Sequence, residues 1–145
     1  MDGLCGVISR KGATTQSKAM NENELSKIVM DVAFDIHKRL GPGLFESVYE
    51  AIMAHELVHE YGLNVQRQKP IPVIWEDVKG DPGFRSDLII NDKLLTELKS
   101  IESFAPVHAK KVLTHIRLTD IRLGLLINFN EELFKNGIKR IVNNL

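Results

Sequence analysis

Seven consecutive residues near the end of the chain, LGLLINF at 123–129, contain a single polar side chain, that of Asn128. A strand that does not alternate between apolar and polar residues is typical of a sheet covered on both faces. The segment therefore predicts a fully buried strand. A chain that contains such a strand needs helices elsewhere to cover the sheet.

Three other segments have the features of helices that could provide this cover. Apolar residues recur at helical intervals over residues 25–40, and the Gly-Pro pair at 41–42 ends that pattern. A second helix is expected at about 44–61, with Gly62 as its C-terminal cap. Pro106 is expected to open a third, because proline suits the first position of a helix.

The segments between the second and third helices predict strands. VQRQKPIPVIWEDV is rich in β-branched residues, and its two prolines suit the start of a strand or a sheet edge. DPG at 81–83 predicts a turn, and residues 84–91 and 94–100 predict a hairpin. The tail GIKRIV fits either a short strand or a turn. The order ααβββαβ thus predicts an α/β fold, with a mixed β-sheet flanked by helices.

Length and composition indicate one globular domain. The 145 residues are 43% hydrophobic and 26% charged, and we predict a single domain at 21–145 after a disordered leader at 1–20. The 19 basic and 19 acidic residues cancel, so a nucleic acid would have to meet a local basic patch. No window approaches the roughly 18 apolar residues of a membrane span. Cys5 is alone, and the opening residues lack the apolar core of a secretory signal, which favours a cytoplasmic location.

Charged side chains interrupt the predicted hairpin FRSDLIINDKLLTELKS. A two-residue turn would send Asp87 and Glu97 to opposite faces. A three-residue loop at 91–93 would place Asp87 opposite Glu97, with Lys99 on the same face one pleat along. We favour the three-residue loop, because it leaves leucine and isoleucine on the other face for a helical layer to cover.

Two carboxylates that face each other across about 5 Å repel, unless one is protonated or a cation lies between them. Ligand sets made only of oxygen favour Mg²⁺ or Mn²⁺, and a water on such an ion can attack a phosphodiester. Lys99 would orient that water or offset the charge of the phosphate. From spacing alone, a second interpretation stands, in which Asp87, Glu97 and Lys99 form a solvated salt-bridge ladder.

An aspartate at 87 followed by ELK at 97–99, after a helix and before a helix–strand unit, resembles the PD-(D/E)xK nuclease superfamily. More narrowly, the chain resembles the bacterial family named for its GxxExxY stretch, which residues 43–49 match in full. The likeness covers residues 22–143 and includes LGLLINF. It implies a restriction-endonuclease-like core in a Mg²⁺-dependent nuclease, with Mn²⁺ as the other candidate ion, that hydrolyses phosphodiester bonds of DNA or RNA.

The resemblance also implies roles for individual residues. Asp87 and Glu97 would bind the metal, and Lys99 would assist the attacking water. Glu46, on the preceding helix, would join the two acids at the metal. Glu46 is also compatible with a simple helix N-terminal acid, which the helix dipole favours. Gln68 is left out of the predicted site as an amide at a strand edge.

One segment departs from the family pattern. In the third helix the family usually has a glutamine followed four residues later by an aromatic, and this chain has Lys111 and His115 at those places. Lys110, Lys111 and Arg117 are predicted to contact nucleic-acid phosphates. Equally, the change is compatible with a catalytically inactive module that binds nucleic acid or protein on the same scaffold. An exposed edge near Pro70 would admit a homodimer.

The HELVH run at 55–59 has the spacing of a zinc-protease motif. Such a site also needs a third ligand and a cleft that faces the helix. The family resemblance already accounts for this run as the body of a helix. A zinc content would distinguish the two interpretations, since a nuclease would hold Mg²⁺ weakly.

Overall fold

The structure is a computed structural model that describes residues 20–145, apart from the side chains of Gly80 and Asp81. Apart from Met20, the predicted leader at 1–20 lies outside the described residues. In chain order the elements are α2 (Glu22–Leu40), α3 (Glu46–His59), β1 (Val65–Trp75), β2 (Val78–Ile90), β3 (Leu94–Lys99), α4 (Pro106–Leu118), β4 (Leu123–Asn128), the 3-10 helix η1 (Phe134–Gly137) and β5 (Ile138–Val142). GIKRIV therefore supplies a strand, β5.

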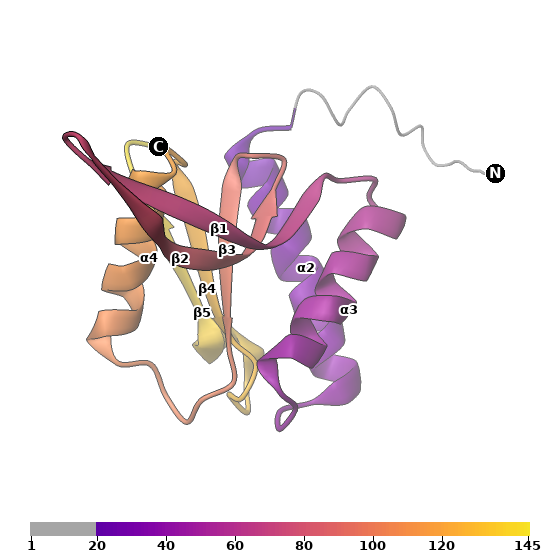
Figure 1. Cartoon of the computed structure of the whole chain (residues 1–145). Coiled ribbons are helices and arrows are strands. Elements are labelled where there is room, and N and C mark those ends of the chain that lie inside the picture. Colours follow the sequence, from indigo (N-terminus) through magenta and orange to yellow (C-terminus); the bar gives the residue numbers. More distant parts are fainter. Residues whose placement is uncertain (1–19) are drawn as a thin grey trace.

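Over this part of the chain the strands form one mixed sheet in the order β1-β2-β3-β4-β5. Neighbouring strands are antiparallel except β3 and β4, which are parallel and are joined by α4. Figure 1 shows α2 and α3 on one side of the sheet and α4 on the other. The predicted α/β architecture, a mixed sheet flanked by helices, is confirmed. None of the helices in the described range is long and apolar enough to span a bilayer.

The buried strand β4 lies where the sequence predicts it. All of its residues are buried, and the cores on both sides of the sheet include residues of this strand. Gly124 allows α4 to pack closely, because a Cβ at that position would lie 2.7 Å from Val112 Cγ1. The close approach at Gly124 thus packs α4 against β4, and α4 also contacts the edge strand β5.

The turn between α2 and α3 is fastened by the tyrosine of the GxxExxY stretch. The Tyr49 hydroxyl donates to the Gly41 carbonyl at 2.6 Å and accepts the Leu44 backbone N–H at 3.2 Å. Its ring stacks on Phe129 with centroids 4.2 Å apart. Gly41 has a φ of 76°, a conformation that favours glycine. Tyr49 therefore sets the position from which α3 starts.

The register of the β2–β3 hairpin is the one that a three-residue loop predicts. Leu88 pairs with Thr96, and Ile90 pairs with Leu94 across the loop at 91–93. The apolar residues of the opposite face lie in the core beneath α2 and α3; they are Leu88, Ile90, Leu94 and Leu98. Asp87 and Glu97 follow directly after Leu88 and Thr96, the last pair joined in this ladder.

The predicted turn at 81–83 is wrong. β2 begins at Val78 and pairs with β1 through this segment, including Pro72 with Pro82. The chain reverses instead between the two strands, where Glu76 has a φ of 51°. The β1–β2 register shifts around Pro72, and these irregularities accommodate the prolines. In addition, β1 is an edge strand, where the missing N–H of a proline removes few hydrogen bonds from the sheet.

Side-chain alternation along the β1–β2 ribbon reverses near Gln68 and Asp87. Leu88 packs under α2 and α3, whereas Phe84, four residues earlier, packs with the cluster under α4. On a regular strand, residues four apart share a face. Gln68 has a φ of 49°, in the left-handed region, which interrupts a regular strand. Asp87 therefore lies where the ribbon twists from one face of the sheet toward the other.

Candidate functional site

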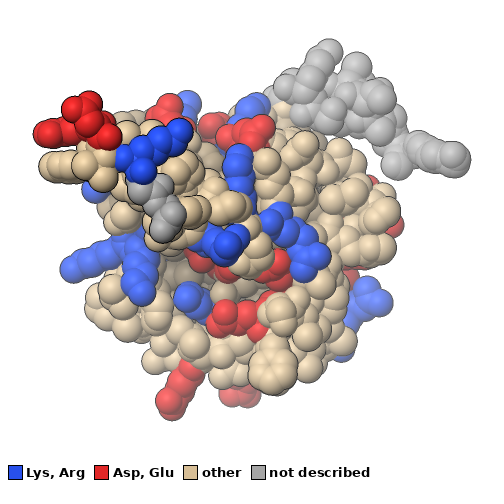
Figure 2. Space-filling view, in the orientation of Figure 1, with Lys and Arg blue, Asp and Glu red and all other residues tan. Residues whose placement is uncertain are grey.

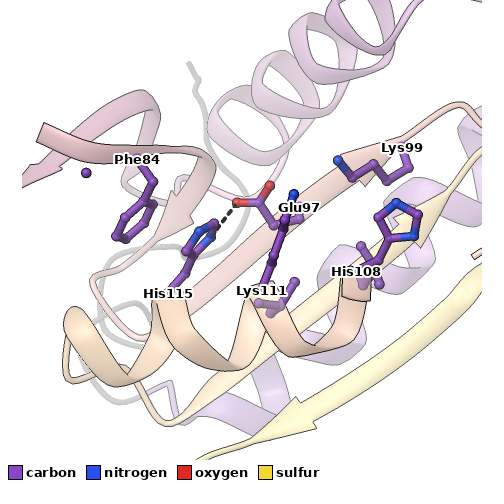
Figure 3. Close-up of a pocket in the computed structure, with 9 residues that line it drawn as sticks. Phe84, Glu97, Lys99, His108, Lys111 and His115 are labelled. Atoms are coloured by element: carbon purple, nitrogen blue, oxygen red, sulfur yellow. Dashed lines mark ion pairs between the residues drawn. The ribbon is translucent and has the colours of Figure 1, made fainter. Parts of the chain in front are cut away.

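A pocket of about 370 Å³ lies between α4 and the sheet. Figure 3 shows Glu97 and Lys99 entering it from β3, and His108, Lys111 and His115 entering it from α4. The crossover from β3 through α4 to β4 brings these two elements together. The structure thus brings together two predicted catalytic residues, Glu97 and Lys99, with Lys111, a predicted phosphate contact, and with two histidines of the helix.

The carboxylate of Glu97 is buried in this pocket. Glu97 is 9% exposed, and its Oε1 has no hydrogen-bond partner among residues 20–145. His115 Nδ1 lies 3.6 Å from that oxygen, which is too long for a hydrogen bond. A buried acceptor without a donor costs roughly 1–3 kcal/mol. A cation bound at Glu97 would remove that cost.

Asp87 lies where β2 and β3 stop pairing. Its Oδ2 accepts the backbone N–H of Leu98 at 2.8 Å, and its Oδ1 accepts the side-chain amide of Gln68 at 3.1 Å. One oxygen is thus bound to β3 and the other to β1. The Asp87 carboxylate thus takes the place that a backbone carbonyl of β2 would have as the acceptor for the Leu98 N–H. It does so at the point where β2 and β3 separate.

The environment of Asp87 favours its protonated form. Burial, and next the negative charge of Glu97, raise the pKa of Asp87 from 3.8 to about 6. The hydrogen bonds from Leu98 and Gln68 lower this pKa, and the charge of Glu50 raises it. Continued by one pair past Leu88 and Thr96, the register of β2 and β3 sets Asp87 opposite Glu97, which accounts for the repulsion between their charges.

Two residues of this network, Gln68 and Glu50, were not predicted as part of the site. Gln68 Nε2 donates to Glu50 Oε1 at 2.6 Å as well as to Asp87, and Arg67 Nε donates to Glu50 Oε2 at 3.1 Å. Glu50 is 6% exposed. Gln68 does lie on the edge strand β1, and its side-chain amide nevertheless reaches the predicted site residue Asp87. Glu50 could have been predicted from the sequence, because it is an acid one helical turn beyond Glu46 in a segment where apolar residues recur at helical spacing.

Glu46, the predicted third acid, lies at the first residue of α3. It is exposed, and its Oε2 accepts the backbone N–H of Ser100 at 3.1 Å, just after β3. It lines a separate hollow with Phe45 and Ser47. The α3 acid that hydrogen-bonds within the Asp87 network is Glu50, so a role for Glu46 at a metal stays a prediction.

The basic residues predicted to contact phosphates lie on α4. Lys110, Lys111 and Arg117 are exposed, and Lys111 also lines the pocket. In Figure 2, Lys and Arg side chains stand beside Asp and Glu side chains on the visible face, so that face is not of one charge sign. Any attraction for a polyanion on this face therefore acts locally, near α4 and the pocket.

The donor atoms of the site fit a divalent cation. Glu97 offers a buried oxygen that lacks a partner, and Asp87 offers a second carboxylate close to it. In the described part of the chain, no group of three His, Cys, Asp or Glu side chains is arranged to hold a metal. The ion would therefore complete its shell with water or phosphate oxygens, as Mg²⁺ commonly does.

A family model for the PD-(D/E)XK nuclease superfamily matches residues 23–141. No curated protein and no solved structure matches the chain. The matched range extends from α2 into β5 and includes Asp87, Glu97 and Lys99.

Proposed function

We propose, because the chain belongs to the PD-(D/E)XK nuclease superfamily, that it is a metal-dependent nuclease that hydrolyses phosphodiester bonds of DNA or RNA. The observation that supports this most directly is the buried Oε1 of Glu97, which lacks a hydrogen-bond partner within residues 20–145 and lies in a pocket with Lys99. A buried acid of this kind is costly unless the protein uses it. The narrower GxxExxY membership stays a prediction.

Asp87 and Glu97 would hold a divalent ion, Mg²⁺ or Mn²⁺. When bound, such an ion activates a water and polarises the phosphate. Lys99, whose side chain faces the same pocket in Figure 3, would orient the attacking water and offset the developing negative charge. Gln68 and the Leu98 N–H would hold the Asp87 carboxylate in place.

Phosphate contacts outside the reacting centre are assigned to α4. Lys111 lines the pocket, and Lys110 and Arg117 are exposed on the same helix. A strand of nucleic acid whose scissile phosphate reaches Glu97 would pass close to this helix. Cationic side chains there would bind neighbouring phosphates without selecting sequence.

A cleavage panel tests the proposal. Labelled single- and double-stranded DNA and RNA are incubated with the protein in Mg²⁺, Mn²⁺ or EDTA. Cleavage is expected with metal, and it should be lost in Glu97→Gln and Lys99→Met, with both variants folded by circular dichroism. Glu60→Gln, an exposed acid at the end of α3, is the matched control. Equal cutting by parent, E97Q and K99M would refute the assigned chemistry.

A second candidate function is a non-catalytic module that binds nucleic acid or protein. Lys111 and His115 favour it, since they replace the glutamine and aromatic that the family usually carries. Such a module would bind nucleic acid equally in EDTA and in Mg²⁺, and it would not cut. A homodimer through the edge strand β1 and a cytoplasmic location also stay predictions.

A further inference from the structure

We propose that His115 is a metal ligand together with Glu97, and that the site therefore prefers a first-row transition ion such as Mn²⁺ or Co²⁺ over Mg²⁺. This inference rests on the proposed function, because it names the ion of the same site. It concerns His115, which stands at the position where the family usually has an aromatic residue.

The two donor atoms are separated by a distance that suits a shared ion. His115 Nδ1 and Glu97 Oε1 are 3.6 Å apart. Two donors that each bind one ion at about 2.1 Å are about 3.0 Å apart at a right angle and about 3.4 Å apart at the tetrahedral angle. The observed separation is close to that of atoms sharing an ion, and it exceeds the roughly 3.2 Å limit of a good N–H···O hydrogen bond.

Both donor atoms, Glu97 Oε1 and His115 Nδ1, are buried, and both lack a hydrogen-bond partner among residues 20–145. The side chains of Glu97 and His115 are 12% and 18% exposed. Native proteins seldom leave two such atoms facing each other. A single ion between them would satisfy both at once.

The imidazole of His115 is held in place by an aromatic neighbour. Its ring stacks on Phe84 with centroids 3.8 Å apart and planes 3° from parallel. Figure 3 shows His115 between Phe84 and Glu97. His108, in the same pocket, differs because its Nδ1 already accepts the Ala105 backbone N–H at 2.9 Å. His115 is thus the pocket histidine whose Nδ1 is available and oriented.

The choice of ion follows from the donor type. Mg²⁺ prefers oxygen ligands, whereas imidazole suits the borderline ions of the first transition row. Among the residues that line the pocket, the two buried side-chain atoms without a hydrogen-bond partner in residues 20–145 are one carboxylate oxygen and one imidazole nitrogen. Asp87 would add a carboxylate oxygen to this set, since each of its oxygens accepts one hydrogen bond, from Gln68 or Leu98, and keeps a second lone pair. A mixed nitrogen and oxygen set of this kind favours Mn²⁺ or Co²⁺.

Metal binding, measured without reference to cleavage, tests the inference. Affinities for Mn²⁺ and Mg²⁺ are determined by calorimetry and by Mn²⁺ paramagnetic resonance for the parent, His115→Phe, Glu97→Gln and the exposed control His59→Phe. Phe at 115 keeps an aromatic ring to stack on Phe84. We expect the parent to prefer Mn²⁺, and H115F to lose about tenfold or more of its Mn²⁺ affinity while its Mg²⁺ affinity changes little. H59F should match the parent.

A measurement on the parent makes the test independent of how H115F folds. In long-range ¹H–¹⁵N spectra, Zn²⁺ should shift the His115 Nδ1 resonance and leave the ring-nitrogen resonances of buried His37, whose Nε2 lies 2.6 Å from the Glu131 carbonyl, unchanged. An unshifted Nδ1, or a folded H115F that keeps the parental Mn²⁺ preference, would overturn the inference in favour of a His115–Glu97 ion pair. If H115F has no effect but E97Q abolishes binding of both ions, this inference alone fails. If the parent binds neither ion, the proposed metal-dependent nuclease fails with it.

Discussion

The side-chain amide of Gln68 donates to the carboxylate of Asp87 at 3.1 Å, from a backbone with a φ of 49°. A non-glycine residue in the left-handed region costs energy and persists only where its surroundings hold it there. Here the same amide also binds Glu50. Gln68 thus lies between two acids, Glu50 of α3 and Asp87 of β2, and donates a hydrogen bond to each.

Replacing Gln68 with leucine should destabilise the protein. The change preserves the size of the side chain but removes the donor shared by Glu50 and Asp87, so the free energy of unfolding should fall by about 1–3 kcal/mol. The pKa of Asp87 should rise further, because the Gln68 hydrogen bond lowers it. Urea denaturation and a carboxyl NMR titration measure the two effects. Gln66→Leu, on the same strand, is the control, and an unchanged Asp87 titration in Q68L would contradict the network.

Asp87 should make the protein less stable as the pH rises. Its pKa is about 6 in the folded protein and ordinary, near 3.8, in the unfolded chain, so the folded state holds the proton between these values while the unfolded state has lost it. The free energy of unfolding then decreases with rising pH through that window. Asp87→Asn lacks this contribution, which is at most about 3 kcal/mol.

The measurement is urea denaturation of parent and D87N in EDTA from pH 4 to 7. The stability of D87N relative to the parent should increase across this range. Asp77→Asn, exposed between β1 and β2, should follow the parent. Parallel curves for D87N and the parent would show that Asp87 titrates normally.

Glu97→Gln should stabilise the protein in EDTA and remove its response to metal. The substitution replaces a buried carboxylate oxygen that has no hydrogen-bond partner in the described range by a neutral amide, so the thermal midpoint should rise. Mn²⁺ should raise the midpoint of the parent but not that of the variant, since only a bound ion favours the folded state. Melting curves with Mn²⁺ and with EDTA measure both. An equal metal-induced shift in E97Q would place the ion elsewhere.

Lys111→Gln should weaken nucleic-acid binding in a way that depends on salt. If Lys111 neutralises one phosphate, its loss lowers the slope of log affinity against log salt by about 1 for DNA. Binding isotherms of E97Q, which should not cut, measure this slope at several salt concentrations with and without K111Q. Lys27→Gln on α2, where the lysine pairs with Asp31 at 3.1 Å, is the control. An identical slope in the K111Q background would remove Lys111 from the interface.

Tyr49→Phe should reduce stability without abolishing cleavage. The hydroxyl accounts for two hydrogen bonds that close the turn between α2 and α3, and its loss should cost about 1–3 kcal/mol. The ring can still stack on Phe129. Denaturation measures the first effect, and cleavage below the melting temperature measures the second. Tyr61→Phe, exposed, is the control. Loss of cleavage in folded Y49F would give Tyr49 a part in the chemistry.

Local patterns determined the order of elements, the buried strand β4 and the register of the β2–β3 hairpin. Each depends on short-range rules, since an apolar run needs cover on both faces and a loop of given length decides which side chains share a face. The register therefore followed from residues 84–100 before any packing was known.

Tertiary structure decided which polar residues join these acids. Gln68 connects Glu50 to Asp87 because the ribbon twists at Gln68 and because Tyr49 positions the start of α3. His115 faces Glu97 because the absence of a side chain at Gly124 allows α4 to pack against β4. These contacts join segments far apart in the chain, and their geometry depends on twist and packing distance, which no local pattern of residues specifies.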